Sequence, residues 1–159
     1  MAEMFLWIDG IQGESTDIER KNWIELQTWN WNTNNPIRWD LNQGGQSTKA
    51  KIDNIQVTKI CDQASVTLHR YCLTGKHFKT ATIVCRKNDG DKKLNYLTVD
   101  MTDVMIQHVK WDGSGDAQTL TETVDISFAD FTLKYKKQRD SGSADGEAHF
   151  RYNIQTQET

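Results

Sequence analysis

The sequence predicts a mainly β fold, a β-barrel of two packed sheets with one flanking α-helix at about residues 63–74. Many of its apolar residues alternate with polar ones, the period of two that a half-buried strand requires. Several alternating stretches are long, and their apolar residues change parity once, which is the pattern of a β-bulge at a barrel corner. One stretch has the helical period instead, with matching signals at both of its ends.

Apolar runs and alternating stretches predict seven strands along the chain. The fourth strand alternates most cleanly, because Ala81, Ile83 and Cys85 share one face. The last strand also alternates, which places Phe150 and Tyr152 among the residues that face inward. The strands are expected at 4–9, 22–31, 49–60, 78–87, 94–111, 119–137 and 148–155.

The change of parity is clearest in the sixth of these strands. Its inward apolar residues run as far as Phe128 and resume with the opposite parity at Phe131. The fifth strand changes in the same way between Met101 and Val104. Because one inserted residue reverses the side that all later side chains face, a β-bulge is expected at both places.

Three local signals support the helix. Asp62 is a favourable N-cap residue, and Gly75 stands where a glycine commonly ends a helix. The apolar residues between them recur at the spacing of one helix face: Ala64, Leu68, Tyr71 and Cys72. We therefore expect a helix at 63–74 whose apolar side faces the core.

The connection at residues 32–48 has no clear periodic pattern. It contains the only proline of the chain, Pro36, and an unsheltered tryptophan, Trp39. Long connections without regular structure are uncommon in compact domains and are usually functional or mobile. We therefore expect an irregular loop with a functional role.

Composition and charge exclude several classes of function. The chain has 159 residues, enough for one domain over residues 1–159, and a mean hydropathy of −0.71. Its formal net charge of −3 provides no basic surface for nucleic acid. No apolar run approaches the roughly 18 residues that suggest a membrane-spanning helix, so no membrane insertion is expected. The N-terminal residues MAEMFLWIDG lack the features of a signal peptide, which predicts a cytoplasmic protein unless some route exports it folded.

The residue types of metal sites and thiol enzymes occur in the middle of the sequence, but their spacing fits neither. Cys61, His69, Cys72, His77 and Cys85 include no closely spaced pair of the kind that holds zinc. A Cys72 nucleophile would need His69 as its base, yet Cys72 belongs to the apolar side of the helix and His69 to the polar side. The carboxylates are scattered, without a pair spaced for acid–base catalysis. The sequence therefore predicts no catalytic residue, no metal, no cofactor and no enzyme.

Six tryptophans are a large number for so polar a chain. Some of them are expected to be buried only when a second protein surface covers them. Exposed aromatic side chains also form sugar-binding platforms. The alternative function is therefore a monomeric β-barrel module that binds a carbohydrate or another ligand through Trp39 and the loop at 32–48.

Three segments of the chain carry a distinctive pattern. They are MFLWIDGIQGESTD, VTKICDQASVTLHRYCLTGKHFKTATIVCRK, and GSG followed by LTETVDISFADFTLKYKKQ. In this order, and over nearly the whole chain, they resemble the haemolysin-coregulated protein family, the tube subunit of type VI secretion systems. The combination of TKxxDxAS…TGKH with a later GSG…LTExVxxxF…Y is far more specific than any part alone.

The resemblance implies a structural protein that closes into a hexameric ring. Such rings stack into the inner tube, which a contractile sheath expels behind a spike protein of the valine-glycine repeat type. It also implies a protein that leaves the cytoplasm without a signal peptide, and small effectors that are carried or stabilised in the ring lumen. Family members are not enzymes unless fused to an effector domain, and because this chain ends at Thr159, after its last expected strand, no such domain is expected.

The resemblance further implies a lumen-facing residue and an interface residue. The WNW at 29–31 matches a family segment that usually reads WSW, whose middle residue faces the lumen. This places Asn30 on the lumen wall, where cargo would pass. Trp7 stands where a lysine is common, on the expected exposed face of the first strand, and is expected at a subunit or ring contact.

The loop at 32–48 corresponds to an extended family loop that is commonly glycine-rich and makes contacts between rings. Gly44 and Gly45 keep that character here, whereas Pro36 and Trp39 are additions. The resemblance therefore implies that this loop contributes to ring stacking, with contacts specific to this protein.

Overall fold

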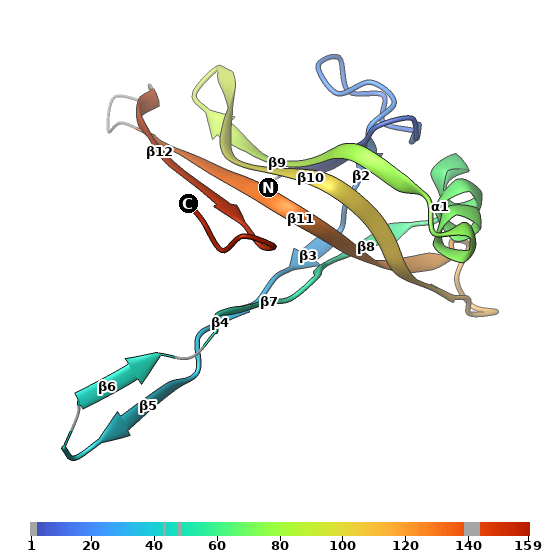
Figure 1. Ribbon diagram of the computed structural model, residues 1–159. Coiled ribbons are helices and arrows are strands. Elements are labelled where there is room, and N and C mark those ends of the chain that lie inside the picture. The colour runs from blue at the N-terminus through green and yellow to red at the C-terminus, as the bar shows by residue number, and fades with distance from the viewer. Residues whose placement is uncertain (1–2, 43, 48, 139–143) are drawn as a thin grey trace.

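The computed structural model describes residues 3–42, 44–47, 49–138 and 144–159. They form a curled β-sheet with a helix at one side and a narrow arm that projects from it (Figure 1). In chain order the elements are β1 (Glu3–Ile8), β2 (Ile24–Glu25), β3 (Thr28–Asn30), β4 (Thr33–Asn34), β5 (Ile37–Asp40), β6 (Gly44–Ser47), β7 (Lys51–Ile52), β8 (Ile55–Ile60), α1 (Gln63–Thr74), β9 (His77–Asp89), β10 (Lys92–Asp112), β11 (Thr121–Gln138) and β12 (Ala144–Asn153).

The main sheet is antiparallel and runs in the order β2-β1-β9-β10-β11-β8-β3, with β12 paired to β11. Its two ends, β2 and β3, belong to one segment of the chain. This segment leaves β1 where Leu26 N donates to Met4 O (3.0 Å). It reaches β8 where Gln27 N donates to Thr58 O (2.8 Å). The sheet therefore curls back on itself. This confirms the mainly β fold with a flanking helix. The two sheets expected from the sequence are the two halves of this one curled sheet, and the long strands β10 and β11 join them.

The hydrophobic core fills the inside of the curl. Ala81, Ile83 and Cys85 of β9 all lie in it, as their alternation predicts. Burial of each large aliphatic side chain contributes about 1.5–3 kcal/mol, so the curl is held mainly by these inward residues. Fully buried members of the core include Leu6, Ile8, Ile24, Ile55, Val57, Leu68, Val99, Met101, Val124 and Ile126.

A corner of the curl explains the change of parity in β10 and β11. On one side of the corner, buried Val104 is paired with buried Phe128. On the other side, buried Met101 is paired with buried Phe131, and the register is unchanged. Between the two pairs Asp103 adopts a φ of 53°, so the backbone of β10 turns over at one residue. The change of parity is confirmed, but the bulge expected at this point is wrong, because no residue is inserted.

Strand β10 does contain two bulges elsewhere. Its register against β9 shifts between Asn95 and Leu97. Its register against β11 shifts between Ile106 and His108. Each shift inserts one residue in β10 and increases the local bend of the strand. The sequence signal for the second bulge is slight, since Val109 is the one partly buried apolar residue that follows it in β10.

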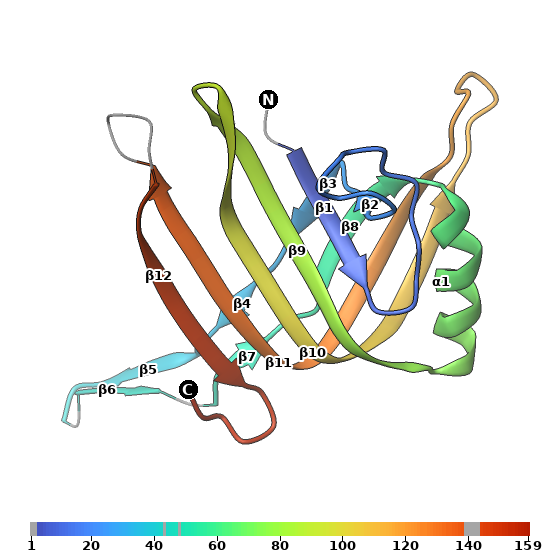
Figure 2. The same cartoon turned by 90° about the horizontal axis from the view of Figure 1, so that it is seen from above.

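The irregular loop expected at 32–48 is wrong for the described residues of this range, which form an arm. Strands β4 and β7 pair as a ribbon, and β5 and β6 pair beyond it as a hairpin that stands clear of the sheet (Figures 1 and 2). Every residue of β5 and β6 is exposed. Ile37, Trp39 and Leu41 do alternate in the sequence, but the paired strand β6 contains no large apolar residue, so the pattern does not reveal a hairpin. Gln43 and Thr48 lie outside the described residues.

Four expected strands lie within two residues of their expected bounds, as β1, β9, β10 and β11, and the other three differ more. The strand at 22–31 is divided into β2 and β3, and the strand at 49–60 into β7 and β8. The last strand begins earlier than expected, at Ala144. Phe150 contacts Phe131 as its inward parity predicts, yet it keeps 44% of its exposure because β12 is an edge strand of the described sheet.

Helix α1 begins and ends as the sequence predicts. Asp62 Oδ1 accepts a hydrogen bond from Ala64 N (3.0 Å), and Ser65 Oγ accepts one from Asp62 N (2.9 Å), which completes a capping box. At the other end Gly75 has a φ of 66° and donates its N–H to Tyr71 O. The helix packs beside β10 (Figure 2). Within the described ranges, no helix has both the length and the apolar character needed to cross a membrane.

Candidate assembly surfaces

Asn30 lies on the outer face of the curled sheet. The tryptophans on either side of it pack towards the core, so strand alternation turns Asn30 away from the core. Its Nδ2 donates to Gln56 Oε1 (3.3 Å), and Gln56 Nε2 donates in turn to Asp125 Oδ1 (2.9 Å). His108 ends this row on β10, with Nδ1 3.9 Å from Asp125 Oδ2. The row therefore crosses four neighbouring strands, and hydrogen bonds orient both of its amides.

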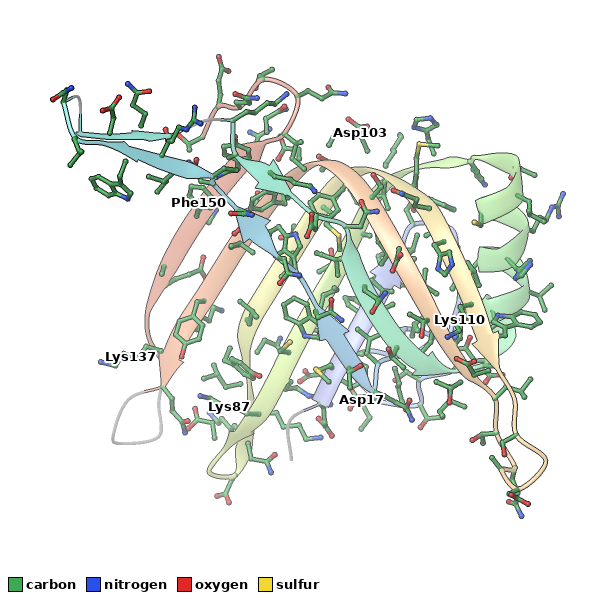
Figure 3. The ribbon with its side chains drawn as sticks, turned by 90° about the horizontal axis from the view of Figure 1, so that it is seen from below. Asp17, Lys87, Asp103, Lys110, Lys137 and Phe150 are labelled. Atoms are coloured by element: carbon green, nitrogen blue, oxygen red, sulfur yellow. The ribbon has the colours of Figure 1, made fainter. Side chains whose placement is uncertain are left out.

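This row belongs to a larger surface that we call the polar wall. Its second row, displaced by two residues along each strand, continues across β3, β8, β11 and β10 and ends at Lys110, which Figure 3 labels. Amides, hydroxyls and single charges of both signs make up these two rows, so the surface is stable in contact with water. The polar wall comprises Thr28, Asn30, Gln56, Thr58, Thr123, Asp125, His108 and Lys110.

The arm has an opposite character, because it exposes large apolar side chains. Ile37 and Trp39 stand two residues apart on one face of β5 and are 57% and 80% exposed. Leu41 follows them and is fully exposed. Trp39 is paired with Gly45, where a Cβ atom would lie 2.7 Å from the indole ring. The ring of Trp39 therefore rests on the glycine backbone and presents its other face to solvent. We call Ile37 and Trp39 the apolar face of the arm.

Other residues singled out in the arm have local structural roles. Gly44 has a φ of 76°, a conformation that costs other residues strain, at the start of β6. Gly45 makes room for the indole ring. Pro36 is exposed directly before β5, where its ring fixes the backbone φ. These three residues give the arm a defined shape before it meets any partner.

An aromatic pocket lies at the root of the arm. It has a volume of about 240 Å³ and is bounded by the arm ribbon on one side and by β11 and β12 on the other. The ring centroids of Phe131 are 6.1 Å from Phe150 and 5.9 Å from Tyr152. Ile52 and Lys51 of β7 line the opposite side. We call this site the aromatic pocket; of its three rings Phe150 is exposed, Tyr152 is half-buried and Phe131 is buried.

Trp7 lies on the outer face of β1 and is half-buried. Its ring centroid is 5.7 Å from that of Trp23, which belongs to the segment before β2. The guanidinium of Arg20 lies 4.9 Å from the centroid of the Trp23 ring. Part of the expected exposed surface of Trp7 is therefore covered within the chain, and the remainder forms a ridge with Trp23.

The sequence and the fold match proteins of one family. The profile of a family described as "Type VI secretion system effector, Hcp" matches residues 5–135. The chain belongs to the Hcp family. It is 30% identical over 145 residues to Protein hcp1 of Pseudomonas aeruginosa, a match that covers 91% of this chain and 90% of that protein.

Solved structures place the fold among Hcp proteins as well. One described as a type six secretion system protein matches with a TM-score of 0.93 at 27% identity, over 99% of both chains. Hcp1 from Salmonella typhimurium matches with a TM-score of 0.79 at 32% identity, over 99% of this chain and 97% of that chain.

Two motifs that carry the Hcp resemblance meet in a buried ionic cluster. Lys59 and Glu122, from TKxxDxAS and LTE, are both fully buried. Lys59 Nζ donates to Asp62 Oδ1 (2.8 Å) and to Ser65 Oγ (2.9 Å). It also donates to Glu122 Oε1 (3.3 Å). Glu122 Oε2 accepts from Trp111 Nε1. The cluster therefore fastens the first turn of α1 to β8, β10 and β11.

This cluster was not predicted from the sequence, because Lys59 and Glu122 stand 63 residues apart. A signal was nevertheless present. Lys59 continues the inward parity of Ile55 and Val57, and Glu122 precedes Val124 with the same parity. A charged residue at an inward position of a strand requires a buried partner of opposite charge, which each of these residues supplies to the other.

A second group of ion pairs, between buried Arg86 and partly exposed carboxylates, holds the N-terminal part of the chain. Arg86 is almost fully buried and donates to Asp17 through Nη1 (3.0 Å to Oδ1) and Nη2. Its Nε donates to Glu3 Oε2 (2.8 Å). The hydrogen bonds from Arg86 hold the pKa of Asp17 at about 2, below its ordinary value of 3.8, and lower the pKa of Glu3. The segment between β1 and β2 is thereby fixed over β9.

The cysteines and histidines of the middle segment lie apart from one another. Burial raises the pKa of Cys85 and of Cys61, which disfavours a reactive thiolate at either position. Cys72 packs partly buried against the core, whereas the His69 ring packs on Trp111 at 5.0 Å between centroids. Among the described residues, no three His, Cys, Asp or Glu side chains gather as they would around a metal ion.

Proposed function

We propose that this chain is a structural subunit of a type VI secretion inner tube, a single domain that closes into hexameric rings and stacks into a tube. The observation that carries the proposal is the arm. A two-stranded hairpin is marginally stable alone in water. In this hairpin every residue of β5 and β6 is exposed to solvent, Ile37 and Trp39 included. Exposed apolar surface of this kind is typical of protein interfaces. A second copy of the chain gives the arm the cover that it lacks.

The polar wall supports a lumen-facing role for Asn30. Hydrated amides and hydroxyls offer a passing protein many weak contacts and little apolar surface to adhere to, so cargo can be held and later released. In this proposal small effectors are retained against the row that starts at Asn30. Trp31 anchors the strand, because its Nε1 donates to Asp53 O (2.9 Å) and its ring packs on Phe131 with 4.8 Å between the centroids.

Membership in the Hcp family supports the remaining partners of this proposal. The tube is driven out by a contractile sheath behind a spike protein of the valine-glycine repeat type. The subunit is made in the cytoplasm and secreted through the system without a signal peptide. It acts by assembly, without catalysis or a cofactor, and the ridge of Trp7 and Trp23 is a candidate subunit contact.

The solution mass of the purified protein tests this proposal. Native mass spectrometry and light scattering over a range of concentrations should give a discrete species of six chains. The alternative is a monomeric module that binds a carbohydrate, and the exposed indole face of Trp39 is the observation that favours it. A species that stays monomeric, with tryptophan fluorescence quenched by a glycan panel, would replace the tube subunit with that module.

A further inference from the structure

The outer side of α1 carries apolar side chains that the fold itself does not bury. The inner side of the helix packs on the core through Ala64 and Leu68, which are both fully buried. Val66 and Leu73 lie on the opposite side and are 69% and 80% exposed. The outer side of a surface helix normally carries polar residues. These two side chains therefore have no role in the core and are free to contact another molecule.

Four exposed residues form one continuous ridge on this outer side of α1. Their spacing of i, i+3, i+4 and i+7 aligns them along one face of the helix, and they are Val66, His69, Arg70 and Leu73. The His69 ring packs on Trp111 with 5.0 Å between the ring centroids, so the ridge is supported by the end of β10. We call these four residues the helix ridge. Figure 2 shows α1 at the opposite side of the molecule from the arm.

Positive charge surrounds the helix ridge. Residues 63–79, which include α1 and the start of β9, contain Arg70, Lys76 and Lys79 but neither Asp nor Glu. The Tyr71 ring holds two of these cations, since the Arg70 guanidinium lies 5.8 Å and Lys76 Nζ 4.3 Å from its centroid. Within the described residues, neither Arg70 nor Lys76 forms an ion pair. Two cations that no described carboxylate neutralises therefore lie beside the ridge.

The carboxylates that adjoin α1 and Trp111 in the sequence are already paired. Asp62, directly before α1, accepts from Lys59 Nζ (2.8 Å). Asp112, directly after Trp111, has Oδ2 3.6 Å from Lys110 Nζ. Neither is available to the cations of the ridge, so a partner that covers the ridge has to bring negative charge with it.

The spacing and the charge of the ridge together fit an acidic amphipathic helix. Rows of side chains three and four residues apart pack into the grooves of a second helix. A second copy of α1 does not fit, because it would set Arg70 and Lys76 of both helices against each other without an acidic residue. A lipid surface fits less well, because two exposed aliphatic side chains are a small apolar area and the chain has a net charge of −3.

We propose that the helix ridge is a docking site for an acidic amphipathic helix of another protein. Val66 and Leu73 pack against the apolar side of that helix, and Arg70 and Lys76 pair with its Asp or Glu side chains. The helix ridge shares no residue with the arm or with the polar wall. The docking site therefore goes beyond the proposed tube and does not depend on it.

A designed peptide tests the docking site on the full chain. The probe is a fluorescein-labelled helix of about 21 residues, with leucine at heptad positions a and d and glutamate at e and g. We expect its fluorescence anisotropy to rise with the wild-type protein. Leu73→Ser and Arg70→Glu should each weaken binding about tenfold or more, because the first removes apolar contact and the second turns attraction into repulsion. The matched control is Ile18→Ser, at a residue 97% exposed in the segment before β2, which should bind as the wild type does.

A second peptide, with lysine in place of every glutamate, separates charge from apolar contact. It should bind Arg70→Glu more tightly than it binds the wild type. A wild-type protein that binds both peptides equally or neither of them overturns the docking site, as does a Leu73→Ser variant that binds like Ile18→Ser. Vesicles of anionic phospholipid that bind the wild type when the acidic peptide does not would replace the helix with a lipid surface.

The native mass of the wild type and of Leu73→Ser is measured alongside. A species of six chains in both, with weakened peptide binding in the variant, supports a docking site outside the contacts between copies. A variant that loses the six-chain species of the wild type would assign the ridge to a subunit contact and overturn the docking site. A wild type that stays monomeric but binds the acidic peptide removes the tube proposal and leaves the docking site standing.

Discussion

Removing one charge from the buried ionic cluster should destabilise the protein more than removing both. In Lys59→Met the Glu122 carboxylate keeps the Trp111 indole as a donor but loses its cation in a fully buried site. An unpaired buried charge of this kind costs about 3–5 kcal/mol. In Glu122→Leu the Lys59 ammonium keeps Asp62 and Ser65, so the loss should be smaller, about 1–3 kcal/mol.

The double variant Lys59→Met/Glu122→Leu removes both charges and fills the site with apolar atoms. Its cost should be well below the sum of the single losses, because replacing a whole buried pair is often nearly neutral. The hydrogen bonds from Lys59 to the cap of α1 are still lost, which leaves a residual cost of about 1 kcal/mol. The coupling between the two sites should therefore be about 2 kcal/mol or more.

The assay is urea unfolding followed by far-ultraviolet circular dichroism. Protein concentration is held constant, because the stability of an assembling protein depends on it. The control pair is Lys110 and Asp112, whose charged atoms are 3.6 Å apart on the surface and whose removal should change stability by about 0–1 kcal/mol. A double variant that loses the full sum of the two single losses would refute the reasoning, since the charges would then not act as a pair.

Three further changes test other parts of the molecule. Asp17→Asn should cost about 1–3 kcal/mol at neutral pH, because Arg86 loses a charged acceptor. Since the pKa of Asp17 lies at about 2 in the fold and at 3.8 ordinarily, this advantage of the wild type exists above 3.8 and should fade as the pH falls towards 2. Urea unfolding at several pH values measures it, with exposed Asp116→Asn as the control, and a constant difference across that range would contradict it. Gly45→Ala should displace the Trp39 ring and weaken ring stacking, measured by light scattering, in the same direction as Trp39→Ala, with hexamers retained. Gly115→Ala should have no effect, because a Cβ there meets no atom within 4 Å. Loss of the hexamer in Trp39→Ala would instead assign the arm to the in-plane interface. Asn30→Arg should leave the ring mass unchanged and alter the retention of co-purified cargo. A broken ring would place Asn30 at a subunit contact.

Local patterns predicted the parts of the fold that local physics determines. The caps of α1 at Asp62 and Gly75 were confirmed, because each acts within a few residues of its own position. The inward face of β9 was confirmed for the same reason. A bulge was predicted at Asp103 because an inserted residue and a single residue with positive φ both reverse the parity of the inward side chains. Only the pairing partners of β10 distinguish them.

The candidate surfaces divide in the same way. The outward position of Asn30 follows from alternation between two tryptophans, which the sequence contains. The arm was missed because only one of its two outer strands alternates: Ile37 and Trp39 mark β5, whereas β6 contains no large apolar residue. The aromatic pocket joins Ile52 to Phe131 and Phe150, and residues so far apart in the chain come together only through the pairing of β11 with β12 and the position of the arm root.

The long ladder between β10 and β11 has a mechanical consequence. The two strands, 21 and 18 residues long, run through both halves of the sheet without a break in the chain. A load applied along them is shared by many backbone hydrogen bonds in shear, whereas a load across them would open the bonds one after another. The protein is therefore stiff along the strands and weaker across them, and under compression along the strands it would first bend at the corner at Asp103.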